Sequence, residues 1–537
     1  MPYLTSFVLL SACVEPDAGC VAGLDADADG VCDRQAADWS ASAQLAPGED
    51  RHNIYDLDED ALAEVTAEGL VIAGAWPVEI SGVMLPSESF SRLLEPGTTD
   101  PGREDFQTLA RSALGFGDME EMADWLGLAR YPADGSVPLP EGVVAGDPMG
   151  MGAVQTEWGP AFSVSCHACH ATELFGKVVV GLTNRRTRAN EYFQLASTFF
   201  PLLTPEMYQD LSGATAEELA LFERAQARLP AVGGTLPLVH GLDTSLAQVS
   251  LSLARREADA WSSLSPAALA APRARALDDA PADSKPAVWW TLRHKTRWLS
   301  DGSVVSGNPI FTNFLWNEVG RGTDLHDLDT WLQDNGRNVD ALTVAVFNTP
   351  SPRWADHLPG LPIDDAAAAR GATVYATHCA SCHGLGADYS RRTEVVDVGT
   401  DAWRAEGMAD FADDLNGLVI SQDNGTVVEV QAGYVPPPLD GIWARFPYLH
   451  NGSVPTLCDL LRQPEDRPTT FVVGPPDDPD TDFDAACVGI PTVPPDAWLD
   501  DPQNVVDTTR PGLGNQGHVT AVPEGDVADL VEFLKTL

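Results

Sequence analysis

Apolar residues recur with helical spacing in several parts of this chain. The segments "AEELALFERAQARL" (216–229) and "TSLAQVSLSLARREAD" (244–259) place apolar side chains three and four positions apart, which predicts helices. A last helix is predicted over 527–534, where apolar residues form one stripe at i, i+3, i+4 and i+7. We expect Asp526 to cap the start of this helix, and Lys535 suits the negative end of its dipole.

A further helix is predicted just before a Cys/His-rich string late in the chain. The stretch "IDDAAAARGATVYATHCASCHG" is rich in alanine, which favours helix, and Asp364 is a suitable N-cap. Stretches rich in proline and glycine at 131–150, 230–243 and 464–512 interrupt the helical patterns and predict long loops. The pattern as a whole predicts a mainly α fold with long loops and few short strands.

The chain is strongly acidic. It carries 79 Asp and Glu residues against 32 Lys and Arg residues, a net charge of −47, which is expected to repel nucleic acid and anionic membranes. The charge serves either solubility, for example in a salty environment, or the steering of a basic redox partner. A length of 537 residues, 44% of them hydrophobic, predicts two or more domains with substantial cores. No run of about 20 apolar residues indicates a transmembrane helix.

The string "SVSCHACHATELFGK" (163–177) places two cysteines and two histidines within five positions. Both residue types bind zinc, but five consecutive positions do not easily wrap a tetrahedral ion with both histidines. In a C-x-x-C-H string the two thiols instead form thioethers with haem vinyl groups, and the adjacent histidine is the proximal iron ligand. On this interpretation Cys166 and Cys169 anchor a haem and His170 binds its iron. His167 is then one of the x residues of the string and does not bind the iron.

A second copy, "CASCH", strengthens the haem interpretation. It supplies Cys379 and Cys382 as anchors and His383 as the proximal ligand. The sequence therefore predicts two covalently bound haem c groups, one in each of two cytochrome c-like domains. The predicted organisation is a lipoprotein signal at 1–13, an acidic tether at 14–50, an N-terminal haem domain at 51–347, a linker at 348–362 and a C-terminal haem domain at 363–537.

The second axial ligand decides what each haem can do. A filled sixth position suits electron transfer, and an open one permits reaction with a small oxidant. His518, in "GLGNQGH" before the last helix, is the predicted sixth ligand of the second haem, with His450 as the alternative. The stretch after the first string contains no histidine or methionine, whereas Met149 and Met151 precede it in a Gly-rich loop. We expect an open first haem, unless one of these methionines binds it.

The other cysteines and the N-terminus indicate export. Cys13 ends "LLSAC", which resembles a bacterial lipobox, although the segment is short and lacks a positively charged n-region. The spacing of the remaining cysteines suits two local disulfides, Cys20–Cys32 and Cys458–Cys487, which form in an oxidising compartment. Haem attachment through C-x-x-C-H also takes place outside the cytoplasm in bacteria. We expect a periplasmic or cell-surface protein that contacts a membrane only through a lipid on Cys13.

The acidic tether contains "DADADGVCD", in which aspartates surround Gly30. Carboxylates at alternate positions with a glycine turn suit calcium, but no glutamate closes a full EF-hand loop. The segment is either a calcium loop or a disordered acidic tether. The candidate calcium ligands are Asp25, Asp27, Asp29 and Asp33.

Several blocks of the chain resemble a known superfamily. The stretch "YVPPPLDGIWARFPYLHNGSVPTLCDLL" (434–461) resembles the signature of bacterial dihaem cytochrome c peroxidases. The blocks "GLTN", "VWWTLRHKTRW" and "GNQGH…LVEFLKTL" look most like its rubber-oxygenase branch, the latex-cleaving dihaem proteins. These blocks are scattered over residues 150–537. The resemblance implies an active-site haem in the N-terminal domain, close to an electron-transfer haem in the C-terminal domain.

The resemblance also implies roles for individual residues. Pro464 stands where short peroxidases carry a methionine ligand, which favours His383 and His518 as the axial pair of the second haem. His450 is then expected to order the loop between the haems and to donate a hydrogen bond, for example to a propionate. Arg445 is expected to pair with a propionate. The alternative for these two residues is a structural turn with a surface arginine.

Two pairs of aromatic residues complete the candidate site. Trp289 and Trp290 are either the source of an aromatic between the haems, which would shorten each electron-tunnelling step, or a pair of core tryptophans. Phe311 and Phe314 are candidates for an apolar distal pocket at the first haem, since the rubber-oxygenase branch uses a distal phenylalanine. A dry pocket of this kind favours bound dioxygen over charged intermediates.

Together the residues predict an exported dihaem oxidoreductase that activates peroxide or dioxygen at the first haem and relays electrons through the second. Three functions compete. The first is a peroxidase supplied with electrons by a small redox protein, and the second is an oxygenase that cleaves an apolar, polyisoprene-like substrate. The third is a pure electron-transfer protein with both irons six-coordinate. The missing methionine and the missing distal histidine argue against the usual form of the first.

Overall fold

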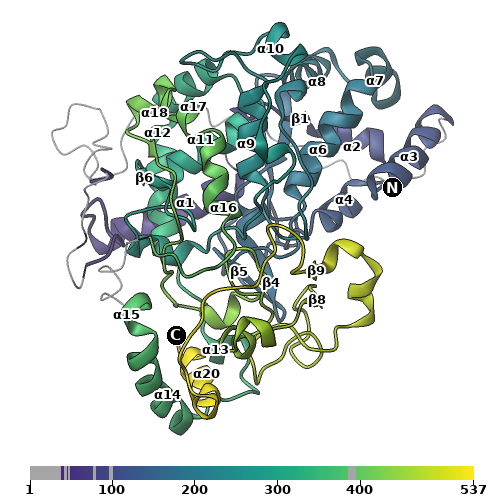
Figure 1. Cartoon of the computed structure of the whole chain (residues 1–537). Coiled ribbons are helices and arrows are strands. Elements are labelled where there is room, and N and C mark those ends of the chain that lie inside the picture. Colours follow the sequence, from purple (N-terminus) through teal and green to yellow (C-terminus); the bar gives the residue numbers. More distant parts are fainter. Residues whose placement is uncertain (1–37, 41–44, 46–48, 76–79, 96–100, 385–394) are drawn as a thin grey trace.

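The computed structural model describes residues 38–40, 45, 49–75, 80–95, 101–384 and 395–537 (Figure 1). Regular structure in these residues is mostly helical, with few short strands, which confirms the predicted mainly α fold. The helices up to residue 348 are α1 (Glu59–Ala75), α2 (Ser87–Leu94), α3 (Pro101–Leu114), α4 (Met119–Trp125), α5 (His167–His170), α6 (Ala189–Phe199), α7 (Pro205–Ser212), α8 (Ala216–Arg228), α9 (Ser245–Ala254), α10 (Pro266–Ala270), α11 (Pro309–Gly320) and α12 (Leu325–Asn348).

The later helices are mostly short. They are α13 (Trp354–His357), α14 (Asp365–His378), α15 (Ala380–His383), α16 (Trp403–Gly407), α17 (Ala412–Asn416), α18 (Val419–Asp423), α19 (Leu457–Leu460) and α20 (Val527–Leu534). The strands are β1 (Leu85–Pro86), β2 (Met151–Thr156), β3 (Gly159–Val164), β4 (Ala171–Leu174), β5 (Lys177–Val180), β6 (Val304–Ser306), β7 (Val427–Val428), β8 (Thr470–Val472) and β9 (Val505–Asp507). They pair antiparallel in one three-stranded sheet, ordered β1-β3-β2, and three two-stranded sheets.

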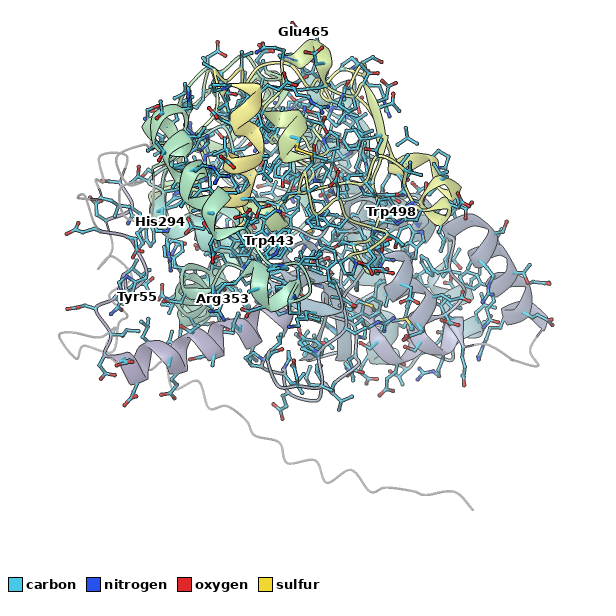
Figure 2. All side chains as sticks on the ribbon, turned by 90° about the horizontal axis from the view of Figure 1, so that it is seen from below. Tyr55, His294, Arg353, Trp443, Glu465 and Trp498 are labelled. Carbon is cyan, nitrogen blue, oxygen red and sulfur yellow. A yellow bond between two sulfur atoms is a disulfide. The ribbon has the colours of Figure 1, made fainter. Side chains whose placement is uncertain are left out.

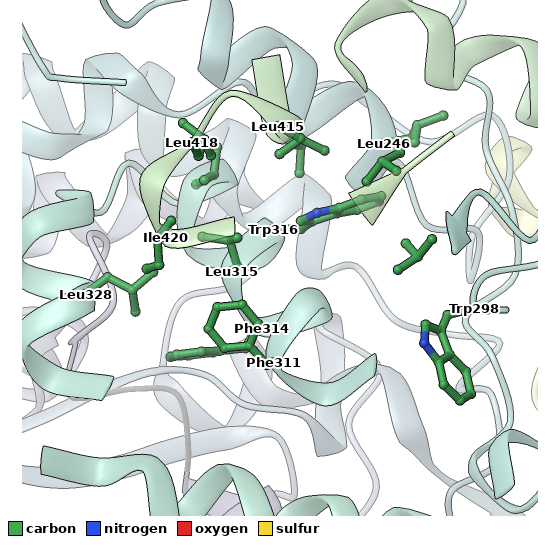
Figure 3. Close-up of a cluster of buried hydrophobic side chains, with 14 of the residues drawn as sticks. Leu246, Trp298, Phe311, Phe314, Leu315, Trp316, Leu328, Leu415, Leu418 and Ile420 are labelled. Carbon is green, nitrogen blue, oxygen red and sulfur yellow. The ribbon is translucent and has the colours of Figure 1, made fainter. Parts of the chain in front are cut away.

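Helices α9, α11 and α12 form the centre of the N-terminal part, and α1 packs along α12 (Figure 1). Asn308 caps α11, because its Oδ1 accepts the first free backbone amides at 2.8 and 3.3 Å. Phe311 and Phe314 of α11 share one buried cluster with Leu246 of α9 and Leu328 of α12 (Figure 3). Each fully buried Leu or Phe side chain contributes about 1.5–3 kcal/mol, so this cluster fixes the position of α11.

The C-terminal part is built on the pair α14 and α20. Gly371 lets the two helices approach closely, because a Cβ at this position would lie 1.9 Å from the Asp529 carbonyl oxygen. Tyr375 of α14 packs on Phe533 of α20 with ring centres 5.1 Å apart. Arg370 binds both carboxylate oxygens of Asp529 at 2.6 Å on the exposed side. The first and last helices of this part therefore hold each other in place.

The segment 348–362 packs closely against the C-terminal part. It contains α13, and Trp354 in that helix is buried against Trp443 with ring centres 5.4 Å apart. The Trp443 indole donates a hydrogen bond to the Pro352 carbonyl (3.0 Å), next to Arg353 (Figure 2). The predicted linker is therefore held against the C-terminal part by side-chain packing and a hydrogen bond.

Residues 464–512, which we call the strap, join the two parts. The predicted Cys458–Cys487 disulfide is confirmed, and it ties the strap to α19. Asp501 of the strap accepts hydrogen bonds from Arg188 (2.7 Å) and His240 (2.8 Å) of the N-terminal part. The turn between β4 and β5 (Figure 1) also contacts the strap, where the Phe175 amide donates to the Pro476 carbonyl at 2.9 Å. The strap therefore adds these polar contacts to the apolar clusters that the two parts share.

The helix predictions differ from the structure mainly at their ends. The helix predicted over 216–229 is α8, whereas that over 244–259 ends earlier, at Ala254. Asp364 caps α14 as predicted. Asp526 precedes α20, but its side chain makes no capping hydrogen bond, so that prediction was wrong. None of the helices in the described residues has both the length and the apolar character needed to cross a membrane.

Candidate haem sites

The first C-x-x-C-H string forms a single helical turn after strand β3. The His170 amide donates to the Cys166 carbonyl (3.1 Å), which closes the turn of α5. Cys166, Cys169 and His170 all line one cavity. His167 is buried outside the cavity wall, with its ring centre 6.2 Å from that of Tyr131. The turn therefore separates the two histidines of the string, and His170 is the one that faces the cavity.

Trp289 lies directly against His170. The two ring centres are 5.5 Å apart and the ring planes are inclined by 38°. Burial lowers the pKa of His170 to about 4, against the opposing effects of Asp243 and the Ala287 backbone. The imidazole is therefore neutral near pH 7, which is the form that binds a metal.

The second string follows α14 directly and forms α15. The His383 amide donates to the Cys379 carbonyl (2.9 Å), as in the first string. Nδ1 of His383 lies 2.8 Å from the Pro437 carbonyl oxygen, so Nδ1–H donates and Nε2 is left for a metal. This contact fixes both the tautomer and the orientation of the His383 ring.

The ring of His518 stands opposite that of His383, with ring centres 6.1 Å apart. Two imidazoles that bind one metal ion from opposite sides, each at a metal–nitrogen distance of about 2 Å, have centres about 6 Å apart. His518 has a left-handed φ of 48°, which costs a non-glycine residue roughly 1–2 kcal/mol and is concentrated at functional sites. The two histidines therefore fit one haem iron between them.

Both strings open onto one continuous cavity of about 900 Å³. This volume is near the upper end of the roughly 300–1,000 Å³ that small-molecule sites occupy. The wall includes residues of α9 and α11 on the N-terminal side and of α14 and α20 on the C-terminal side. A joint cavity between the two parts fits two haems held close together.

The cavity wall is cationic, although the chain as a whole is acidic. Its charged side chains, apart from histidine, are Lys285, Lys295, Arg321, Arg404 and Arg445, against the carboxylates Asp243 and Asp397. Burial, together with Arg445, lowers the pKa of Lys295 to about 8. A carboxylate bound beside Lys295 would raise that pKa again. Haem carries two propionates, so this wall suits its charge.

His450 and Tyr434 form a pair in the wall. Their rings stack with centres 4.1 Å apart, and His450 Nε2 lies 3.1 Å from the Tyr434 hydroxyl. The neighbouring Asn451 donates to two carbonyl groups of the segment 512–514, which leads to His518. His450 is predicted to donate a hydrogen bond to a propionate, and in the structure its loop also holds the segment that leads to His518.

The two adjacent tryptophans face different surroundings. Trp289 lines the cavity, whereas Trp290 is buried outside its wall and donates to the Asp440 carbonyl (2.8 Å). The two phenylalanines divide in the same way, since Phe314 lines the cavity and Phe311 is buried in the core. The structure therefore brings one member of each predicted pair to the cavity.

The first string has no second axial ligand in the described part of the wall. That part contains no methionine, and its histidines beyond the predicted proximal ligands His170 and His383 are His378, His450 and His518. His378 precedes the second string, and the other two have the partners given above. Met149 and Met151 lie outside the wall, in hydrophobic clusters. The wall thus offers His170 no partner comparable to the one that His383 has.

Several predictions fall outside the described residues. These are the lipid site Cys13, the disulfide Cys20–Cys32 and the calcium ligands Asp25, Asp27, Asp29 and Asp33. In the ranges that the structure does describe, no group of three or more His, Cys, Asp or Glu side chains is placed to hold a metal ion.

The cationic residues of the wall and the amides of α11 were not predicted from the sequence. Lys285 and Lys295 are two of only four lysines in the chain, and both line the cavity. The small number of lysines was the sequence feature that could have marked them as candidate site residues. Asn313 and Asn317 lie on a helix whose other residues are mostly buried, and they also line the cavity. Their spacing of four positions on a helix that contains Phe314 would have placed them on one face.

Comparison with known proteins identifies cytochrome c domains in the C-terminal part. Residues 433–472 match the family described as RoxA-like, cytochrome c-like, and residues 366–432 match the family described as cytochrome C oxidase, cbb3-type, subunit III. The chain is therefore a haem-binding redox protein with haem c in its C-terminal part.

Two curated proteins of Sinorhizobium fredii are similar to part of the chain. The uncharacterized protein y4iJ is 29% identical over 258 residues, which cover 35% of this chain and 41% of that protein. The uncharacterized protein y4iM is 32% identical over 237 residues, which cover 34% of this chain and 52% of that protein. The matched region thus spans about half or less of the length of these relatives.

Proposed function

We propose that the protein is an exported dihaem c-type oxidoreductase that activates peroxide or dioxygen at its first haem and delivers electrons through its second. The first haem is attached to Cys166 and Cys169, and the second to Cys379 and Cys382. A haem supplies reversible one-electron chemistry and, where its sixth position is open, a binding site for a small oxidant. The residues of the chain supply attachment, axial ligands and a shielded cavity.

The observation that carries this proposal is the contrast between the two proximal histidines. His383 has His518 opposite it at a ring distance of 6.1 Å, which suits a six-coordinate iron. His170 has no such partner among the wall residues described above. A protein with one six-coordinate haem and one haem with an open sixth position can store an electron at the first of these and react with an oxidant at the other.

The chain positions both sites by hydrogen bonds and packing. The Pro437 carbonyl holds the proton of His383 on Nδ1, and the Val398 carbonyl accepts the His518 amide at 2.8 Å. Trp289 packs on His170 and lies in the cavity wall that both sites share. An indole at this place supports electron transfer between the sites, since it shortens the distance across which each electron must tunnel.

Export and a redox partner are part of the same proposal. A structural disulfide such as Cys458–Cys487 forms in oxidising compartments, which supports a periplasmic or cell-surface location. The net charge of −47 supports a basic redox protein as the electron donor, because opposite charges speed association. A lipid on Cys13 would attach the protein to a membrane.

Spectroscopy of the purified holoprotein tests the proposal. We expect one low-spin, six-coordinate haem and one haem that is high-spin or that binds carbon monoxide after reduction. The comparison should be made in the fully oxidised and the fully reduced protein. Two low-spin, six-coordinate haems in every redox state would reject an enzyme and leave a pure electron-transfer protein.

A second candidate function is an oxygenase that cleaves an apolar, polyisoprene-like substrate. It is favoured by the apolar residues that share the wall with the first string. These are Phe193, Ile310, Phe314, Leu342 and Val346. An apolar wall both admits an apolar substrate and keeps water away from a bound oxidant. Oxygen uptake that depends on added polyisoprene, and is not replaced by peroxide, would select this function over a peroxidase.

A further inference from the structure

Helix α11 presents two amides to the cavity beside the first string. Cys166 packs against the hydrophobic cluster that α11 helps to form, and Arg321 at the end of α11 lines the same cavity as Cys166 and Cys169. The cavity-facing side of α11 includes Ile310, Asn313, Phe314 and Asn317. These positions follow the i, i+3, i+4, i+7 spacing of one helical face. Pro309, Thr312 and Trp316 of the same helix also line the cavity, so the two amides stand among mostly apolar side chains.

Asn313 is held in place by its neighbour on the same face. The Asn317 Nδ2 group donates to Asn313 Oδ1 at 3.0 Å. Thr312 and Phe314, on either side of Asn313, are buried, whereas Asn313 itself is exposed and lines the cavity. The hydrogen bond occupies the carbonyl of Asn313 and leaves its Nδ2 donor group free to bind a ligand.

The other amides of the wall are already used by the protein. Gln248 donates to the Gly320 carbonyl (3.2 Å), and Asn190 donates to the Asp243 carboxylate (3.2 Å). Of the four side-chain amides in the described part of the wall, Asn313 is the one whose NH₂ group has no protein acceptor. A donor of this kind, next to the apolar side chains of Ile310 and Phe314 on the same helix, is a specific site for an acceptor atom.

We propose that Asn313 is a ligand-binding residue that donates a hydrogen bond to the small oxidant at the first haem, with Asn317 as its positioning residue. The inference rests on the proposed function, since it requires an open position there. Peroxide and dioxygen share the chemistry that Asn313 would recognise, an oxygen atom that accepts a hydrogen bond. An amide donor binds such an atom without supplying a proton, unlike a histidine or a carboxylic acid.

The experiment compares fluoride and carbon monoxide as probes of the holoprotein. Fluoride binds the oxidised haem and accepts hydrogen bonds strongly, whereas carbon monoxide binds the reduced haem and accepts them poorly. A hydrogen bond to a charged group contributes about 1.5–3 kcal/mol, so Asn313→Leu should weaken fluoride binding by about tenfold or more and change carbon monoxide binding little. Asn317→Leu keeps the Nδ2 donor of Asn313 but removes the hydrogen bond to the Asn313 Oδ1 atom. This variant should give an intermediate loss of fluoride affinity.

The matched control is Gln333→Leu, which removes an exposed helical amide on α12 that pairs with Asp329 outside the cavity. Haem content is measured first for each variant. Equal fluoride affinity in the wild type and N313L would overturn the inference. An equal loss of fluoride and carbon monoxide affinity in N313L would also overturn it, because it indicates damage to the fold. If the wild type binds neither ligand, the proposed function fails and the inference fails with it.

Two further measurements identify which oxidant uses the donor. Faster dioxygen dissociation from the reduced N313L protein would assign the hydrogen bond to dioxygen. Slower peroxide consumption by N313L at low peroxide concentration would assign it to peroxide. Either result supports the inference, and a variant unchanged in both contradicts it.

Discussion

His383 and His518 lie opposite each other with ring centres 6.1 Å apart and ring planes inclined by 50°, although one belongs to a helical turn and the other to a loop near the C-terminus. Gly517 makes this approach possible, because a Cβ there would lie 2.2 Å from the Gly399 backbone. The His518 loop therefore packs closely against the segment 398–400. This contact holds the His518 ring at a distance from the His383 ring that suits one iron between them.

Replacing His518 should change the second haem alone. In His518→Ala we expect that haem to lose its second strong ligand and to become high-spin or bind an added ligand. Absorption and electron paramagnetic resonance spectra of the oxidised protein measure this change. His450→Ala is the control, since His450 is stacked on Tyr434 and should leave the spin state unchanged. The opposite result would make His450 the axial ligand.

Each C-x-x-C-H string should hold one covalent haem. We expect two haems per chain in the wild type and one in either Cys166→Ala/Cys169→Ala or Cys379→Ala/Cys382→Ala, because each cysteine pair anchors its own group. Mass spectrometry of the denatured protein counts haems that remain covalently bound. A wild type with a single haem would restrict the cofactor to the C-terminal domain that the comparisons identify.

The two tryptophans should differ in their effect on electron transfer. Trp289→Phe removes the indole that packs on His170 in the cavity wall, and we expect slower transfer between the haems. Trp290→Phe removes a buried hydrogen bond to the Asp440 carbonyl, which should lower stability by about 0.5–1.5 kcal/mol with little effect on transfer. Flash photolysis of the half-reduced, carbon monoxide-bound protein measures the rate. Equal rates in all three proteins would make both tryptophans structural.

Asp283 should make stability depend on pH. It is buried, and burial raises its pKa from 3.8 to about 7, while the Leu238 amide bonded to one oxygen opposes the shift. The folded state therefore keeps this proton up to about pH 7, whereas the unfolded chain loses it near pH 3.8. The unfolded state then binds fewer protons, so the free energy of unfolding falls as the pH rises between these values.

Asp283→Asn removes this dependence. We expect the variant to be more stable than the wild type at pH 8, by at most about 4 kcal/mol, and the difference to shrink as the pH falls toward 5. Denaturant midpoints at several pH values measure it. Asp279→Asn makes the same chemical change at an exposed position nearby and should behave like the wild type. A constant difference between the Asp283→Asn variant and the wild type at all pH values would contradict the assignment.

Sequence patterns predicted the structural features that depend on residues close together in the chain. The α14 cap at Asp364, helix α8 and the Cys458–Cys487 disulfide all depend on short sequence separations, and the structure has each of them. The predicted end of α9 was wrong because polar residues after Ala254 continue the helical pattern, whereas the chain turns there. Propensity alone cannot detect such an end when tertiary contacts decide it.

The shape of the candidate site depends on contacts that are distant in sequence. Trp289 and Trp290 are adjacent, and no pattern could tell that the first lines the cavity and the second supports the C-terminal core. The same holds for Lys285 and Lys295, whose side chains meet residues of the other part only after folding. His518 was predicted from its place in "GLGNQGH" before the last helix, and its distance from His383 required the structure.

The shared wall of the cavity has a consequence for the biogenesis of the protein. Burial raises the pKa of Cys166 to about 11 and that of Cys169 to about 12, so neither thiol is a ready nucleophile once the chain has folded. The strap closes over the junction of the two parts through Asp501. We therefore expect haem attachment at these cysteines to take place after export but before the chain has folded, and folding to enclose the haem afterwards.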